Sequence, residues 1–166
     1  TGSLMHNAVI RVMPNTPARI GEGISVWVNS AGATPEHLEI ARETLKCLGT
    51  DVYVEEESYL DMATALSGTG PAYVFLFMEA LIDAGVHMGF PRWIAEELVV
   101  STLRGSVLYY QANHEHPAAM RNQVVSPGGT TAEALYYLEK AGFRTAISRA
   151  VWAAYQRSKE LGAEMN

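Results

Sequence analysis

The chain has 166 residues, of which 48% are apolar and 18% are charged, and this balance excludes an intrinsically disordered protein. Its 18 acidic and 12 basic residues give a net charge of −6, which argues against a nucleic-acid or anionic-lipid partner. The single cysteine, Cys47, excludes an intrachain disulfide and favours a reducing compartment such as the cytoplasm.

The first 57 residues predict two strands, a helix and a third strand. Apolar runs over 8–13 and 24–28 predict the first two strands, and 51–55 predicts the third. Thr34 followed by Pro35 is typical of a helix start. Strands this apolar need helices over both faces of their sheet, so we expect the C-terminal piece of a larger α/β domain.

From residue 58 onward the hydrophobic period is helical, which predicts an all-α, bundle-like part and, for the whole chain, the α+β class. Ser67 or Thr69 is expected to cap a helix with Pro71 near its start. The expected helices cover 71–89, 91–113, 117–125, 130–142 and 143–161.

The helix over 71–89 has one narrow polar stripe, Glu79, Asp83 and His87, and is apolar around the rest of its circumference. Such a helix must be buried on several sides, so we expect a second copy of the chain to cover it. The apolar stretch 62–78 contains Gly-Thr-Gly-Pro and is followed at once by acidic residues, so we expect no membrane span.

The loop 124–131, Val-Val-Ser-Pro-Gly-Gly-Thr-Thr, combines the features of a small anion site. Pro127 restricts one backbone angle, and two glycines let the chain approach a ligand closely. A helix starts at Thr130 or Thr131, so its free amide groups and positive dipole end adjoin the loop. These features predict a site for a carboxylate or phosphate, although an ordinary capped turn has the same composition.

Two further loops are candidate sites. The segment 66–72, Leu-Ser-Gly-Thr-Gly-Pro-Ala, contains glycines and hydroxyls before a helix, and 13–17, Met-Pro-Asn-Thr-Pro, leaves the end of a strand where ligands bind in α/β sheets. A tight turn and a rigid connection are the alternatives. The two histidines His114 and His116 lack a convincing third ligand, so we expect no metal site.

Together these loops resemble those of the pyrroline-5-carboxylate reductase family. Their order and spacing match along the chain from about residue 8 to 162, and the serine-proline-glycine-glycine loop is the most specific part. The matching segments are 13–17, 65–73, 89–92, 116–117, 125–131 and 141–144.

The resemblance implies an oxidoreductase of proline biosynthesis, which transfers a hydride from NADPH or NADH to the C=N bond of 1-pyrroline-5-carboxylate and forms L-proline. It also implies that 1–57 is the C-terminal remnant of a dinucleotide-binding Rossmann domain. Residues 58–166 would be a helical dimerisation and substrate-binding domain, in a homodimer or a higher ring assembly. Because these 166 residues lack a glycine-rich phosphate loop, we expect them alone to be inactive and to bind no NADPH.

The same resemblance implies roles for individual residues. The substrate carboxylate would be held by Val124, Ser126, Gly129, Thr130 and Thr131. The cofactor would lie near Asn15, Ser67, Gly70 and Pro71. An acidic side chain of the partner chain is expected near the His-Pro step; His114 holds that place here, and Glu115, one residue further, is the candidate catalytic residue.

Two alternatives remain open. A β-hydroxyacid-type dehydrogenase would place a lysine and an asparagine where this chain has Val74 and Met78, and neither residue can act as a base. A helical dimerisation module without catalysis is the second alternative.

Overall fold

The computed structural model describes residues 6–164. In this part of the chain lie three strands, seven α-helices, one 3₁₀ helix and one π-helical segment. The described residues form two units, 6–73 with 149–164 and 74–148. The proposed domain boundary after residue 57 stays a prediction.

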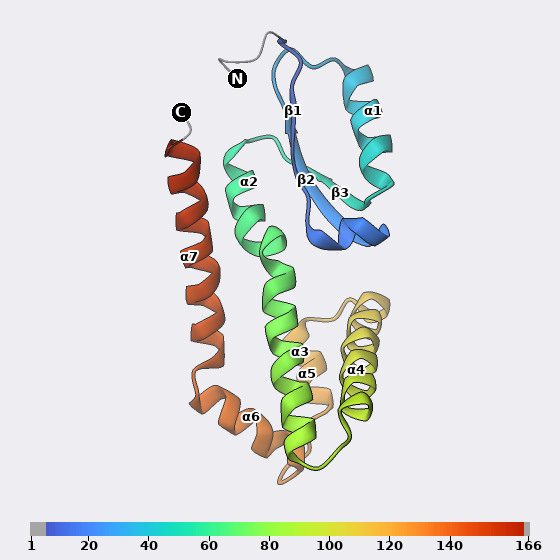
Figure 1. Ribbon diagram of the computed structural model, residues 1–166, viewed down its shortest axis with the longest axis vertical. Helices are drawn as coiled ribbons and strands as arrows, with labels where there is room; N and C mark the ends of the chain where they lie inside the picture. The colour runs from blue at the N-terminus through green and yellow to red at the C-terminus, as the bar shows by residue number, and fades with distance from the viewer. Residues whose placement is uncertain (1–5, 165–166) are drawn as a thin grey trace. The chain divides into compact units, whose positions relative to one another are not determined.

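The first unit is built on a three-stranded sheet with the order β1-β2-β3 (Figure 1). β1 runs antiparallel to β2, and β2 runs parallel to β3. The helix α1 forms the crossover between the two parallel strands, so the predicted β-β-α-β order is confirmed. The elements are β1 (Ile10–Met13), the 3₁₀ helix η1 (Thr16–Ile20), β2 (Gly23–Asn29), α1 (Pro35–Lys46) and β3 (Gly49–Tyr53).

The start of α1 follows the prediction from Thr34 and Pro35. Thr34 Oγ1 accepts a hydrogen bond from the His37 backbone N at 3.4 Å, and His37 Nδ1 accepts one from the Thr34 N at 3.1 Å. This reciprocal pair satisfies two amide groups at the helix start. At the other end, a hydrogen bond to the Glu43 carboxylate raises the pKa of Lys46.

Both faces of the sheet are covered, as its apolar strands predicted. On one face Trp27 is fully buried, its Nε1 donates to Asp51 Oδ2 at 3.0 Å, and Arg42 of α1 lies over its ring. On the other face Val26 and Val28 pack with two residues of α2 (Ser58–Ala63), namely Leu60 and Ala63. The sheet therefore lies between α1 and α2 (Figure 1).

The second unit is helical, and its helices agree with the expected ranges to within a few residues. Gly85 of α3 packs against Ala95 of α4 so closely that an added Cβ would lie 2.9 Å from the Ala95 Cβ. Arg92 at the start of α4 binds Asp83 of α3 at 2.7 Å. The remaining elements of the chain are α3 (Gly70–His87), α4 (Arg92–Asn113), α5 (Pro117–Gln123), α6 (Thr130–Lys140) and α7 (Phe143–Glu164).

The predicted capped helix start at Ser67 or Thr69 is wrong. A π-helical segment, η2 (Thr64–Gly68), joins α2 to α3 in one helical run. Ser67 Oγ donates back to the Ala63 carbonyl at 2.9 Å, and the Thr69 N donates to the Thr64 carbonyl at 2.8 Å, five residues earlier. Pro71 has no N–H for the normal i−4 bond, and a widened turn accommodates its ring.

By length and composition, the helical run Ser58–His87 could cross a membrane, and little of it is buried within the single chain. The surface of a neighbouring protein chain, like lipid, can bury such a helix. The expectation that it does not span a membrane stays a prediction.

Candidate functional site

A tight turn precedes α6 at the predicted anion loop. The Gly129 N donates to the Ser126 carbonyl at 3.0 Å, which closes a four-residue turn. Pro127 and Gly128, with φ of 69°, occupy its central positions. This is the pattern of a type II turn, in which glycine is favoured because the third residue needs a positive φ.

The helix α6 begins at Thr130, as the sequence predicted, and Gly129 is its N-cap. A glycine cap has no side chain to accept from the first amide groups of the helix, and a Cβ at this position would overlap the Ser126 hydroxyl. Thr131 is half-buried beside these amides. Glu133 in the first turn supplies a partial counter-charge to the helix dipole.

The structure places Glu115 beside the start of this loop. His114 ends α4 with a φ of 53°, a left-handed conformation that is uncommon for residues other than glycine. Glu115 Oε2 then accepts from Gln123 Nε2 at 2.7 Å. Gln123 is the last residue of α5 and directly precedes Val124, so the carboxylate lies where the loop leaves the helix.

The second candidate region lies in the first unit, at the end of β1. Asn15 Oδ1 accepts from the Ile24 N at 3.0 Å, and Asn15 Nδ2 donates to the Ser67 carbonyl at 3.3 Å. Gly68 approaches Met13 so closely that a Cβ would overlap the methionine methyl group. The structure therefore brings the predicted cofactor residues Asn15 and Ser67 together.

Gly70 and Pro71 follow this contact at the start of α3, and both are half-buried. A Cβ on Gly70 would meet no atom within 4 Å. The backbone here is consequently open to the approach of a ligand. Each set of predicted residues is thus assembled within its own unit, the cofactor set in the first unit and the loop with Glu115 in the second.

Sequence reasoning missed Gln123, which binds Glu115, and the hydroxyls that fix the π-helical segment. Thr69 Oγ1 donates to the Thr64 carbonyl at 2.9 Å, and Tyr73 Oη donates to the Ala65 carbonyl at 3.1 Å. Pro71, four residues after Ser67, is the sequence signal for this segment, because it leaves the Ser67 carbonyl without its helical N–H donor.

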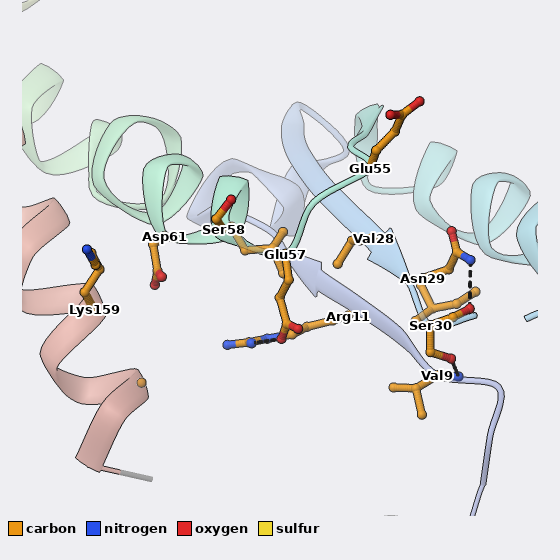
Figure 2. Close-up of a pocket in the computed structure, with 13 residues that line it drawn as sticks. Val9, Arg11, Val28, Asn29, Ser30, Glu55, Glu57, Ser58, Asp61 and Lys159 are labelled. Carbon is orange, nitrogen blue, oxygen red and sulfur yellow. Dashed lines mark hydrogen bonds and ion pairs between the residues drawn. The ribbon is translucent and has the colours of Figure 1, made fainter. Parts of the chain in front are cut away.

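A cavity of about 780 Å³ lies elsewhere in the first unit, beside β1, α2 and the end of α7 (Figure 2). Arg11 and Glu57 form an exposed ion pair there. Figure 2 shows Lys159 of α7 and Asp61 of α2 on facing elements, and Ser158 Oγ donates to Asp61 Oδ1 at 2.6 Å. None of the predicted site residues lines this cavity.

Within residues 6–164, no group of three His, Cys, Asp or Glu side chains is placed to hold a metal ion.

Comparison with known proteins gives a family match. The model of the family described as pyrroline-5-carboxylate reductase dimerisation matches residues 57–161. A pyrroline-5-carboxylate reductase of Synechocystis is 46% identical over 94% of this chain and 58% of its own length. One of Pisum sativum is 40% identical over 94% of the chain and 57% of its own length.

A solved structure is also similar. The crystal structure of Plasmodium falciparum pyrroline carboxylate reductase with NADP bound superimposes with a TM-score of 0.91 and 38% identity. The match covers 95% of this chain and 63% of that one. The predicted combination of a partial Rossmann-type piece and a helical part is confirmed. The chain spans about three fifths of the length of these relatives.

Proposed function

We propose that the chain, which belongs to the pyrroline-5-carboxylate reductase dimerisation family, takes part in the reduction of 1-pyrroline-5-carboxylate to L-proline. The observation that carries the proposal is the family match over 57–161, and the glycine-capped turn at the start of α6 supports it. The relatives bear the name of this activity.

The substrate carboxylate is proposed to bind at the turn before α6. Gly129 supports this role because it leaves the first amides of the helix without a side-chain cap. Ser126 and Thr130 are exposed, and Thr131 is half-buried, so hydroxyl donors adjoin the same amides. When backbone and hydroxyl groups at a helix N-terminus bind a carboxylate, they stabilise its negative charge and hold it in one orientation.

The cofactor is proposed to lie against Asn15, Ser67, Gly70 and Pro71. The residues fit such a group, because Gly70 leaves room for close approach and the π-helical segment before it is held by several hydrogen bonds. When bound, NADPH or NADH supplies the hydride. The chain's own residues then have to bind, orient and shield the reactants.

A second copy of this chain is the proposed partner. Phe75 and Leu76 of α3 are 60% and 66% exposed in the single chain, and the matching family is one of dimerisation domains. Glu115 is proposed as the acidic group offered from one protomer to its partner's site. A homodimer or a ring built from dimers, in the cytoplasm, is the assembly we propose.

Replacing Thr131 with valine tests the carboxylate site, because it keeps the side-chain shape and removes the hydroxyl donor. A hydrogen bond to a charged group contributes roughly 1.5–3 kcal/mol. At about 1.4 kcal/mol per tenfold, kcat/KM for 1-pyrroline-5-carboxylate should fall about 10- to 150-fold in the protein encoded by the complete reading frame. NADPH affinity should hardly change.

Thr145→Val on α7 is the matched control, since Thr145 is exposed on another helix and should be nearly silent. A Thr131→Val protein that folds and keeps the wild-type kcat/KM would refute the assignment. So would a loss that appears in the NADPH affinity instead.

A further inference from the structure

The side chain of Asn15 joins three segments of the first unit through both ends of its amide. Its Oδ1 accepts from the Ile24 N at the start of β2, at 3.0 Å. Its Nδ2 donates at 3.3 Å to the Ser67 carbonyl in the π-helical segment. Asn15 itself precedes η1, two residues after β1 ends. With both ends engaged by backbone groups, the amide is placed to hold these segments together.

The Ser67 carbonyl can accept a hydrogen bond from Asn15 because residue 71 is a proline. In an α-helix the carbonyl of residue 67 would accept from the N–H of residue 71, and proline has none. A half-buried carbonyl without a partner is costly, and Asn15 supplies the missing donor from another segment. Met13 packs against Gly68 beside this bond, so the strand end and the helical run are in close contact.

We propose that Asn15 is a positioning residue. Through the Ser67 carbonyl it fixes the π-helical segment and with it the backbone of Gly70 and Pro71. Because both ends of its own amide are engaged by backbone groups, it acts on the reaction by placing these residues, and its side chain contributes to the proposed cofactor site only as part of the surface that they form. The consequence for catalysis rests on the proposed function, whereas the positioning is a property of the 166-residue chain and can be measured on it.

Asn15→Asp provides the first test, because it keeps the acceptor for the Ile24 N and replaces the donor by a carboxylate oxygen facing the Ser67 carbonyl. At pH 7.5 the Tm of the chain should fall by about 3–8 °C, from one lost hydrogen bond and one repulsive contact. In the folded variant, burial and hydrogen bonding of the neutral form should raise the new carboxyl's pKa above its unfolded value of about 3.9.

The sign of the pH dependence follows from this shift. The folded variant binds a proton more readily than the unfolded variant, so its stability relative to wild type should recover as pH falls from about 7 towards 4.5. The groups bonded to Asn15 are uncharged backbone groups. The nearby charged residues of η1 and its following turn, Arg19 and Glu22, are exposed. A deficit in Tm that stays constant over this range would overturn the proposal.

Pro71→Ala provides the second test, because it gives residue 71 an N–H that can bind the Ser67 carbonyl in place of Asn15. In the Pro71→Ala background, Asn15→Asp should lower the Tm by less than half as much as it does in the wild-type background. Independent sites would show equal effects in both backgrounds, and that result would contradict the proposal. Asn122→Asp, an exposed asparagine of α5, is the matched charge control and should show neither recovery at low pH nor coupling to Pro71.

In the protein encoded by the complete reading frame, Asn15→Asp should lower kcat for 1-pyrroline-5-carboxylate at least tenfold at pH 7.5. The loss should diminish as pH falls, in parallel with the recovery of Tm. If the wild-type protein reduces no pyrroline-5-carboxylate, the proposed function fails while the Tm results stand. If it does and kcat is unaffected in the folded variant, the positioning role fails.

Discussion

Ser25 has a buried side-chain hydroxyl for which the described residues provide no hydrogen-bond partner. It is 1% exposed, on the same face of β2 as Trp27. A buried polar group without a partner costs about 1–3 kcal/mol of folding free energy. The position is therefore a weak point in the core of the first unit.

We expect Ser25→Ala to stabilise the chain, since it removes the unpaired hydroxyl and leaves only a small void. Differential scanning calorimetry at a fixed protein concentration should show a Tm rise of about 2–4 °C. Ser30→Ala is the contrasting variant, because Ser30 Oγ accepts from the Val9 N at 2.9 Å and donates to the Asn7 carbonyl at 2.6 Å. Ser30→Ala should lower the Tm. If Ser25→Ala lowers the Tm by the same amount, the Ser25 hydroxyl has a hydrogen-bond partner in solution.

At the scale of elements, local signals predicted most of the fold. Thr34 with Pro35 places the start of α1, and Gly129 with Thr130 places the start of α6. Caps and turns of this kind are decided by neighbouring residues, so the sequence contains the information.

The π-helical segment could not be predicted in the same way. Ser67, Gly68 and Pro71 are typical of a loop, and the helix continues because Met13 and Asn15, more than fifty residues earlier, pack and bond against it. The pairing of Glu115 with Gln123 likewise depends on how the chain turns at His114. Both belong to tertiary structure, which a local pattern does not encode.

Several large apolar side chains of α3 are exposed in the single chain. We expect sedimentation equilibrium of the 166-residue chain to give a dimer at micromolar concentration, through an interface that buries roughly 2,000 Å² or more. Phe75→Glu should shift the chain towards monomer, because it would bury a charge in that interface.

Glu79→Gln is the control for this experiment, since Glu79 lies on the polar stripe of the same helix and its removal should leave the dimer intact. A wild-type chain that sediments as a monomer at micromolar concentration would contradict the proposed assembly. A dimer that Phe75→Glu leaves unchanged would place the interface elsewhere.

At the scale of the whole molecule, the chain combines two candidate regions with different chemistry. The turn before α6 has uncapped amides and nearby hydroxyls, which we propose bind an anion, and the region at the end of β1 has an open backbone beside Gly70. The matched segment covers 58% and 57% of the length of the Synechocystis and Pisum sativum relatives. Among these 166 residues, Gly21 and Gly23 begin a glycine pattern that Val26 interrupts, so no dinucleotide phosphate loop is expected here.

The most direct test of the proposed function is the initial rate of NADPH oxidation, followed by absorbance, with and without 1-pyrroline-5-carboxylate. We predict that the protein encoded by the complete reading frame oxidises NADPH only when the imine is present and forms L-proline in equal amount. The 166-residue chain should show no such rate. Failure of the complete protein to oxidise NADPH in the presence of the imine would contradict the account.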